Sequence, residues 1–298
     1  MGLAVLTSLI WGFAYVTYQF GLESFSAAQL SAVRFFIACL PILFVPRPKV
    51  PWWTLLLIGV VMFAGQFLLL MMSYSLGMPA GLGSVTQQTQ AVFTVLLAAV
   101  LLGERPTVRQ GSGMAIAFAG LALIGVTIGT DLTPAALALA LAAALAWAIG
   151  NIVVKRIANV SVFGLMVWCS LIAIFPLLAF SWAFDPQPSI VRAVTHASWL
   201  SLAVALYLAV PSTLLGYGLW AYLLRRYPAP VVAPFGRLSP ATGILSAALL
   251  LGETFSALRI AGMGLILLGL AVIVMPATTL SSSRGARSAP EQSRSTDA

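Results

Sequence analysis

Long apolar runs separated by short polar breaks fill almost the whole chain. A helix needs about 20 mostly apolar residues to cross the hydrocarbon core of a bilayer, and each run is close to that length. The runs predict ten membrane-spanning helices, at residues 3–20, 27–45, 52–77, 80–102, 107–128, 134–156, 161–183, 198–224, 229–251 and 257–275. Serine, threonine, arginine and proline then replace the apolar residues, so we expect a disordered cytoplasmic tail at residues 277–298.

One short phrase occurs twice in the chain. Leu-Leu-Gly-Glu ends the fourth run at Glu104 and the ninth run at Glu253, and a glycine-rich apolar helix follows each copy. The two glutamates lie 149 positions apart, and the same offset places Gly113 on Gly262. This self-similarity at a fixed offset indicates an internal duplication.

Each copy contains five predicted spans, so the second copy must cross the membrane in the opposite sense to the first. The sequence therefore predicts an all-α membrane protein of two five-helix inverted-topology repeats, at residues 1–130 and 131–276. Repeats of this kind build transporters whose solute site lies near the midplane, between the halves.

The repeated Gly-Glu phrase has two interpretations. A glycine just past a helix end can take the left-handed conformation that closes the last turn, and a carboxylate at the start of the next helix meets the positive end of its dipole. Glu104 and Glu253 are then helix-turn residues. The alternative is that they take part in transport, as proton carriers.

The composition excludes a soluble globular domain, because 61% of the 298 residues are hydrophobic and only 7% are charged. Cys39 and Cys169 fall inside predicted spans and are interpreted as small apolar side chains, so we expect no disulfide, metal site or cofactor. The chain starts without a basic segment before its first apolar run. We therefore expect a retained first helix and not a cleaved signal peptide.

The net charge of +8 is unevenly distributed over the loops. If the N-terminus lies inside, the inner loops and the tail hold eleven basic residues: Arg47, Lys49, Arg105, Arg109, Lys155, Arg156, Arg225, Arg226, Arg284, Arg287 and Arg294. The outer loops hold only Arg192 and Arg259. Because cytoplasmic loops are enriched in basic residues, both termini are predicted to be cytoplasmic. We expect a lipid bilayer and a small solute as partners, no nucleic acid, and a monomer or weak homodimer.

Aromatic residues recur on one face of the first span. Trp11, Tyr15 and Tyr18 follow at i, i+4 and i+7 and so share a helical face. The sixth span, its counterpart, carries Trp147 and then Asn151. An asparagine within a membrane usually faces the bundle interior, so these aromatic residues are candidates for solute binding, although packing between helices is the alternative.

The fourth span contains six polar residues within seven positions, from Ser84 to Gln90. Consecutive residues of a helix point all round its axis, so this stretch cannot face lipid on any side. It predicts a hydrated cavity enclosed by protein, the alternative being hydrogen bonds that hold helices together.

The matching stretch of the ninth span has two prolines and a glycine around Arg237, which aligns with Gln88. These residues predict a kink or an unwound segment, which is tolerated at membrane depth where it lines a cavity. A fixed cation there suits a carboxylate or phosphate of the solute. Arg34, in the second span, is expected to snorkel or to bond backbone carbonyls. Pro211 predicts a kink in the eighth span.

These motifs together resemble the drug/metabolite transporter superfamily, in its EamA-type branch of ten-helix carriers. The resemblance rests on the Leu-Gly-Glu phrase after the fourth and ninth spans, the glycine-rich helices that follow, and Trp11 and Trp147 near the start of each copy, and it covers residues 3–275. The chain departs from the pattern at Ala91, where the first copy often has a proline. The resemblance implies an inner-membrane exporter of metabolites, most like the bacterial aromatic amino acid exporters.

The sequence analysis thus predicts an amino acid exporter that works by alternating access and needs no obligatory proton. Other solutes with proton coupling, a channel and an accessory subunit are the alternatives. An intramembrane enzyme is disfavoured, because the single histidine, His196, lies in a loop and no acid lies within a span. The predicted solute site consists of Trp11, Tyr15, Tyr74, Gln87, Gln88, Trp147, Trp168, Tyr207, Tyr217 and Arg237.

Overall fold

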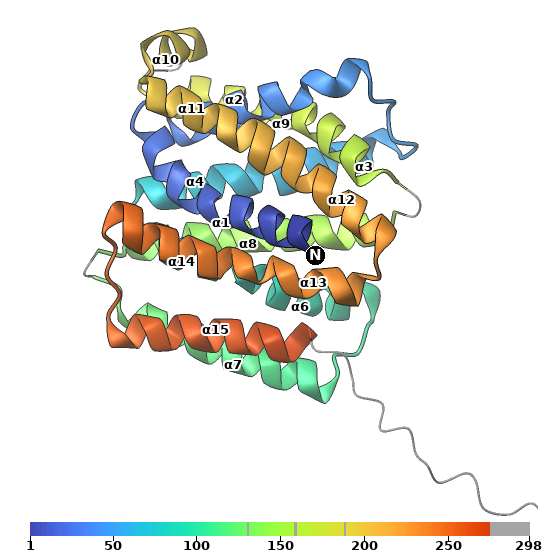
Figure 1. Cartoon of the computed structure of the whole chain (residues 1–298), viewed down its shortest axis with the longest axis vertical. Helices are drawn as coiled ribbons and strands as arrows, with labels where there is room; N and C mark the ends of the chain where they lie inside the picture. Colours follow the sequence, from blue (N-terminus) through green and yellow to red (C-terminus); the bar gives the residue numbers. More distant parts are fainter. Residues whose placement is uncertain (130, 158–159, 188, 275–298) are drawn as a thin grey trace, which may run out of the picture.

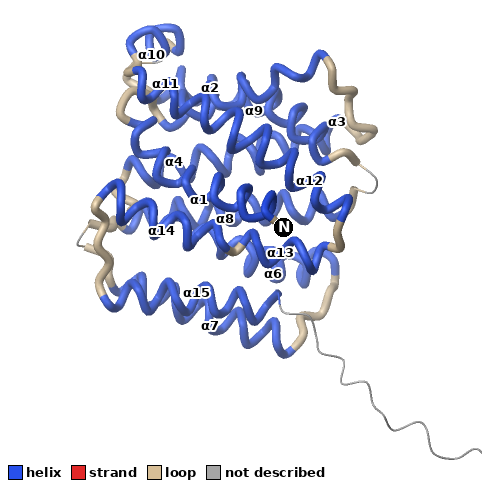
Figure 2. The backbone as a smooth tube through the Cα atoms, in the orientation of Figure 1, coloured by secondary structure: helices blue, strands red, loops and turns tan. Residues whose placement is uncertain are grey.

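The computed structural model describes residues 1–129, 131–157, 160–187 and 189–274, and every regular element among them is a helix (Figures 1 and 2). Most helices lie side by side and run across the view in Figure 1, with short connections at the two ends of the bundle. The predicted tail at residues 277–298 lies outside the described residues.

The first five predicted spans are formed as follows. The elements are α1 (Gly2–Leu22), α2 (Ala27–Cys39) with η1 (Leu40–Leu43), α3 (Trp52–Leu57) with η2 (Ile58–Gly65) and α4 (Gln66–Ser75), α5 (Ala80–Thr86) with η3 (Gln87–Thr89) and α6 (Gln90–Leu102), and α7 (Val108–Val126).

The second five spans follow the same plan. The elements are α8 (Pro134–Lys155), α9 (Val162–Phe184), α11 (Trp199–Tyr207) with η4 (Leu208–Leu215) and α12 (Gly216–Arg226), α13 (Ala229–Gly236) with α14 (Leu238–Leu251), and α15 (Ala257–Val274). A short helix that the apolar pattern did not predict, α10 (Ile190–His196), lies in the connection between α9 and α11.

In the described part of the chain, eight helical segments are long and apolar enough to cross a membrane. The second span is shorter, at Ala27–Leu43, and the ninth is divided at Arg237. Every predicted span is helical over most of its length, and its ends lie within a few residues of the predicted ones. The apolar pattern therefore located the spans correctly.

Local sequence signals explain where several helices begin and end. Ser26 and Thr107 cap α2 and α7 by accepting hydrogen bonds from the amides of the residues three positions on, and the glutamines at those positions bond back. Gly103 and Gly252 have φ angles of 67° and 65°, which close the last turns of α6 and α14. The predicted role of these two glycines is confirmed.

The third span of each repeat, which is the third and the eighth span of the chain, contains a π-helical segment at a matching position. These segments, η2 and η4, begin 150 residues apart, and each has eight residues. Pro211 lies within η4, whereas η2 has no proline, and its wider turns were not predicted. π-helical segments are rare and are frequently found at functional sites.

The fourth and ninth spans are also irregular at matching positions. Gln87–Thr89 form the 3₁₀ turn η3, and the ninth span breaks at Arg237, between α13 and α14. The predicted break around Arg237 is confirmed. The first copy loses its regular α-helical geometry at this depth as well, even though Ala91 replaces a proline there.

Helices α7 and α15 form a pair at one edge of the bundle (Figure 1). A Cβ atom on Gly120 would lie 2.5 Å from the carbonyl oxygen of Gly262, and one on Gly262 would lie 2.8 Å from that of Gly120. Gly113 and Gly269 face each other in the same way. Because only glycine allows the two backbones to approach this closely, we interpret the α7–α15 pair as a structural support of the bundle.

The two ends of the bundle differ in charge. We call the end that holds Arg47, Lys49, Arg105, Arg109, Lys155, Arg156, Arg225 and Arg226 the basic end. We call the end that holds Glu23, Asp131, Asp185, Arg192, Glu253 and Arg259 the acidic end. Helix α1 begins at the basic end (Figure 1).

Candidate functional site

Aromatic side chains from both repeats meet near the middle of the bundle. Trp11, midway along α1, lies with its ring centroid 5.5 Å from that of Tyr217 and 5.3 Å from that of Trp220. Tyr217 stacks on Trp147 at 6.3 Å and on Phe63 at 6.5 Å. We call these five residues the aromatic cluster. Their tilted and stacked arrangements are those that aromatic rings prefer.

The position of Trp11 depends on the π segment η4. Its indole Nε1 donates a hydrogen bond of 2.9 Å to the carbonyl oxygen of Ser212, which lies in η4. A Cβ atom on Gly216 would lie only 2.5 Å from the same indole nitrogen. The irregular helix and the missing side chain therefore both make room for Trp11.

Arg34 lies deep in the bundle beside this cluster. It is 2% exposed, its Nε donates to the hydroxyl of Thr213 at 2.8 Å, and its Nη1 donates to the hydroxyl of Tyr18 at 3.2 Å. Its guanidinium carbon is 4.0 Å from the ring centroid of Phe67, a cation–π contact. The expectation that Arg34 snorkels or bonds backbone carbonyls is wrong, because the kinked eighth span brings a hydroxyl within its reach.

Three tyrosines extend from Arg34 toward the acidic end. The ring of Tyr18 is 6.1 Å from that of Tyr15 and 5.7 Å from that of Tyr74. Tyr18, which the predicted site had left out, therefore links Tyr15 and Tyr74 to Arg34.

The polar stretch of the fourth span is enclosed by protein, as predicted. Ser84, Thr86, Gln87 and Thr89 are buried, and Gln88 is half-buried. Among the described residues, the side-chain oxygens of Gln87 and Thr86 have no hydrogen-bond partner. Buried polar atoms without a protein partner are the ones that ordered water or a polar solute satisfies.

Asn151 faces the bundle interior, which confirms the prediction for the sixth span. Its Nδ2 donates to Gln90 at 3.0 Å and to the hydroxyl of Thr94 at 3.2 Å. These bonds join α8 to α6 on the side of the aromatic cluster that faces the basic end. Some of the polar residues of the fourth span therefore do hold helices together.

Arg237 lies on that same side, at the break between α13 and α14. The carbonyl of Phe235, two residues before it, accepts a hydrogen bond of 2.6 Å from Ser8 of α1. A Cβ atom on Gly236 would lie 3.3 Å from the ring of Trp220. Because Ser8 precedes Trp11 in α1, this bond places the break on the basic-end side of Trp11, where Arg237 is half-buried.

Two residues of the predicted site have structural contacts elsewhere. The indole of Trp168 donates to the carbonyl of Val45 at 3.1 Å, and its ring packs edge-on against Trp52 at 6.0 Å, at the basic end. The hydroxyl of Tyr207 donates to the carbonyl of Ile10 at 2.7 Å, which ties α11 to α1. Trp168 therefore lies apart from the aromatic cluster, because the sequence does not show at what depth of the bundle a side chain of α9 meets its neighbours.

The two repeated glutamates have different partners. Glu253 accepts hydrogen bonds from the amides of Ala80, at 2.5 Å, and Gly81, at 3.0 Å, at the start of α5. Glu104 is half-exposed and pairs with Lys155 at 2.6 Å. Among the described residues, neither carboxylate has a hydrogen bond to an amide of the helix that follows it, and Thr107 caps α7 instead. Glu253 meets the positive end of a different helix.

Burial raises the pKa of Glu253, which lies in the connection between α14 and α15. The amide bonds from Gly81 and Ala80 lower this pKa, as does Arg259, whereas Asp131 raises it. Because burial is the largest effect, this carboxyl binds a proton more readily than an exposed glutamate does.

The acidic end is held together by further polar contacts. Arg259 is 4% exposed, donates to Thr127 at 2.9 Å and pairs with Asp131 at 2.5 Å. Ser26 donates to the carboxylate of Asp185. These contacts join helices of both repeats and close this end of the bundle.

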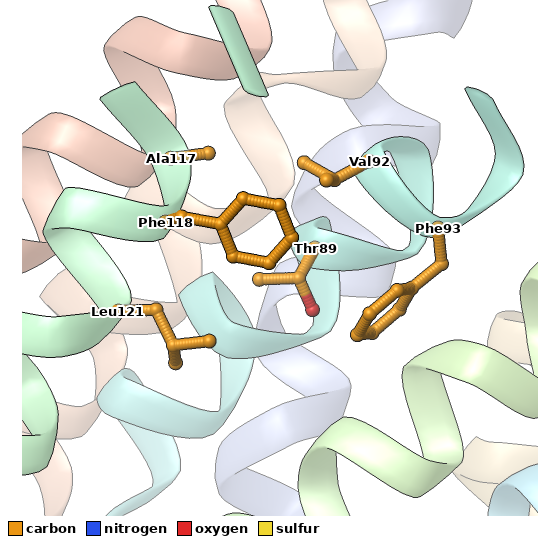
Figure 3. Close-up of a pocket in the computed structure, with 6 residues that line it drawn as sticks. All are labelled: Thr89, Val92, Phe93, Ala117, Phe118 and Leu121. Carbon is orange, nitrogen blue, oxygen red and sulfur yellow. The ribbon is translucent and has the colours of Figure 1, made fainter. Parts of the chain in front are cut away.

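Two hollows lie outside the aromatic cluster. Figure 3 shows an apolar crevice between η3, α6 and α7, lined by Thr89, Val92, Phe93, Ala117, Phe118 and Leu121. Its volume of about 10 Å³ is no larger than one water molecule needs. A cavity of about 170 Å³ opens at the basic end, and Glu104 and Lys155 are among its lining residues. Only the second hollow is large enough for a small solute.

Comparisons with known proteins agree on the class of the chain. The model of the EamA-like transporter family matches residues 1–126 and again residues 134–275, one match for each predicted repeat. A crystal structure with 19% sequence identity covers 91% of this chain and 96% of its own at a TM-score of 0.58, which shows the same fold.

Several relatives are named for amino acid efflux. A protein of Salmonella typhimurium named a probable amino-acid metabolite efflux pump is 40% identical, and the match covers 91% of this chain and 93% of the relative. A protein of Escherichia coli with the same name is 38% identical over the same shares. A probable terminal-alkyne amino-acid exporter of Streptantibioticus cattleyicolor is 27% identical over 90% of this chain and 91% of its own. The chain is thus a multi-pass membrane exporter, not an enzyme, and it belongs to the EamA-like transporter family.

Proposed function

We propose that this protein exports amino acids, aromatic ones among them, and related small metabolites across the bacterial inner membrane. The observation that carries the proposal is the aromatic cluster, to which both repeats contribute near the middle of the bundle. Flat rings at this depth suit solutes with an aromatic or apolar side chain. The names of the three relatives, all of which refer to amino acids, support the same solute class.

The proposed solute site keeps most of the residues that the sequence indicated. Some members belong to the aromatic cluster or lie near it, and the others lie on the irregular segments of the fourth and ninth spans. They are Trp11, Tyr15, Tyr74, Trp147 and Tyr217 in the first group, and Gln87, Gln88 and Arg237 in the second. Trp168 is left out because it lies at the basic end, and Tyr207 is left out because its hydroxyl ties α11 to α1.

The basic end is proposed to face the cytoplasm, with both termini there, because cytoplasmic loops are enriched in arginine and lysine. Solute would enter from the cavity at this end, and release would require the contacts of Glu253 and Arg259 at the acidic end to open. Movement of residues 1–130 against residues 131–276 would expose the site to the two sides in turn.

Transport is proposed to follow the solute gradient without an obligatory proton. Among the described residues no aspartate or glutamate lies within a spanning helix: Glu23, Glu104, Asp131, Asp185 and Glu253 all lie in connections or at helix ends. Glu253 is the one observation that favours a second candidate, proton-coupled export, since burial raises its pKa. An imposed pH gradient with equal solute on both sides of a proteoliposome distinguishes the two candidates, because only coupling gives uphill accumulation.

The central test is counterflow in proteoliposomes loaded with each of the twenty amino acids in turn. We expect saturable uptake of labelled phenylalanine against unlabelled aromatic and large apolar amino acids, and weak exchange against acidic ones. Non-saturable flux would indicate a channel. An absence of counterflow with every amino acid would contradict the proposed function.

Arg237 is proposed to attract carboxylate-bearing solutes on the basic-end side of the aromatic cluster. We expect Arg237→Ala to slow the transport of amino acids more than that of their methyl esters, because an ester carries no negative charge. Equal losses for acid and ester would make Arg237 a structural residue of the ninth span.

A further inference from the structure

Arg34 is a buried cation whose surroundings carry no negative charge. Its partners are the hydroxyls of Thr213 and Tyr18 and the ring face of Phe67, all of them neutral. The two ion pairs of the described residues join Lys155 to Glu104 and Arg259 to Asp131, so no described carboxylate lies within ion-pairing distance of Arg34. Burying an unpaired charge is costly, which makes this position unusual for a purely structural residue.

Some of the N–H donors of the Arg34 guanidinium have no hydrogen bond to a described residue. Arginine has five N–H donors in a planar fork. The bonds to Thr213 and Tyr18 use one on Nε and one on Nη1, and Nη2 has no hydrogen bond to a described residue. Thr213 and Tyr18 therefore fix the orientation of the fork and leave donors for a planar anion, which a carboxylate matches with two parallel bonds.

The surroundings of these donors match the remainder of a free amino acid. The ring of Phe67 lies against the Arg34 guanidinium, and Phe67 packs through Phe35 on Phe63 of the aromatic cluster. Among the described residues, the buried side-chain oxygens of Gln66, which precedes Phe67, and of Tyr74, which packs on Tyr18, have no hydrogen-bond partner. Such oxygens can accept hydrogen bonds from an ammonium group.

We propose that Arg34 binds the α-carboxylate of the exported amino acid and is thereby the residue that selects free amino acids over esters and amines. The inference rests on the proposed function and deepens it, since it assigns the solute's charged end to the acidic-end side of the aromatic cluster. Arg237 lies on the other side, so the two arginines act at different depths.

The first experiment compares ligands on the wild-type protein in detergent. Phenylalanine, its methyl ester and phenethylamine are titrated by calorimetry, since they share a ring and an amine and differ only in the carboxylate. We expect the ester and the amine to bind at least about tenfold more weakly, as loss of a charge-assisted hydrogen bond implies. Equal binding of all three would overturn the inference and leave the proposed function intact. Absence of binding by phenylalanine and of counterflow by any amino acid would contradict the proposed function itself.

The second experiment places the effect on Arg34. We expect Arg34→Met to weaken phenylalanine binding at least about tenfold, but to change phenethylamine binding little, because only phenylalanine has a carboxylate to lose its partner. Arg34→Lys keeps the charge and loses the fork, so an intermediate loss is expected; this variant decides the question if Arg34→Met does not fold. Arg109→Gln, at the basic end, is the matched control and should bind all three ligands like the wild type. Wild-type affinity for phenylalanine in the folded Arg34 variants would overturn the inference.

Discussion

The carboxylate of Glu253 accepts a hydrogen bond of 3.0 Å from the backbone amide of Gly81, and so joins the end of the ninth span to the start of the fourth. The repeat cannot build the same contact at the basic end. Glu104 aligns with Glu253, but Pro230 aligns with Gly81 and has no N–H to donate. The duplicated phrase therefore makes this amide contact at the acidic end alone, whereas Glu104 pairs with Lys155 at the basic end.

Removing the Glu253 carboxylate should loosen the acidic end. We expect Glu253→Ala to reduce the hydrogen-exchange protection of the Ala80 and Gly81 amides about tenfold or more, as loss of a charge-assisted bond implies. Hydrogen–deuterium exchange with mass spectrometry measures this directly. Glu104→Ala is the control, and it should leave the same amides protected. Unchanged protection in Glu253→Ala would mean that other contacts keep this end closed.

Closure of the acidic end should depend on pH. Burial raises the pKa of Glu253 in the closed arrangement, and the pKa would return to its ordinary value if opening exposed the carboxyl to water. The closed form then binds protons more tightly than the open form, so closure is most favourable below the ordinary glutamate pKa and weakens as the pH rises through the raised one. We expect protection of the Ala80 amide, corrected for intrinsic exchange, to fall across that window. Glu253→Gln should show no such dependence.

Gly216 should tolerate no side chain. A Cβ atom there would lie 2.5 Å from the indole nitrogen of Trp11, whereas a Cβ atom on Gly218 would have its nearest neighbour at 3.7 Å. We expect Gly216→Ala to displace Trp11 from Ser212, to destabilise the protein by about 1–3 kcal/mol as overpacking does, and to reduce transport. Thermal unfolding in detergent and counterflow measure the two effects. Gly218→Ala should behave like the wild type; similar losses in both variants would point to a helix effect unrelated to Trp11.

The contact between α7 and α15 should matter for stability and not for solute recognition. We expect Gly120→Ala to lower the Tm, because its Cβ would lie 2.5 Å from the carbonyl oxygen of Gly262. Gly264→Ala is the control, since no atom lies within 4 Å of its added Cβ. Folded Gly120→Ala should bind phenylalanine with unchanged affinity in a titration at low temperature. A changed affinity would place this helix pair in the transport site.

Trp147 should favour aromatic solutes over small ones. Its ring stacks on Tyr217, and an aromatic pair is worth about 0.5–1.5 kcal/mol beyond burial, so we expect Trp147→Leu to weaken phenylalanine binding about two- to tenfold. Alanine binding should change less. Trp168→Leu, at the basic end, is the matched control for loss of a tryptophan. If both variants reduce phenylalanine binding equally, the aromatic cluster is not the solute site.

The sequence by itself determined the architecture, because a bilayer leaves few solutions for the backbone. Runs of about 20 apolar residues must become helices that satisfy their own hydrogen bonds, and the offset between Glu104 and Glu253 showed the duplication. Local chemistry likewise placed the left-handed turns at Gly103 and Gly252 and the break at Arg237, since these depend on the residues themselves.

Only the tertiary structure decided what these helices bring together. Arg34 was expected to snorkel or to bond backbone carbonyls. The sequence could not show its partner Thr213, because Thr213 lies 179 positions away in a π segment. Trp168 looked like a site residue, because helical periodicity gives the face of a side chain and not which neighbour it meets. Glu253 was expected to meet the positive end of the helix that follows it, yet it bonds to amides more than 170 positions earlier. Such pairings follow from how the two repeats dock, and docking depends on the shape of whole helix surfaces, which no short stretch of sequence encodes.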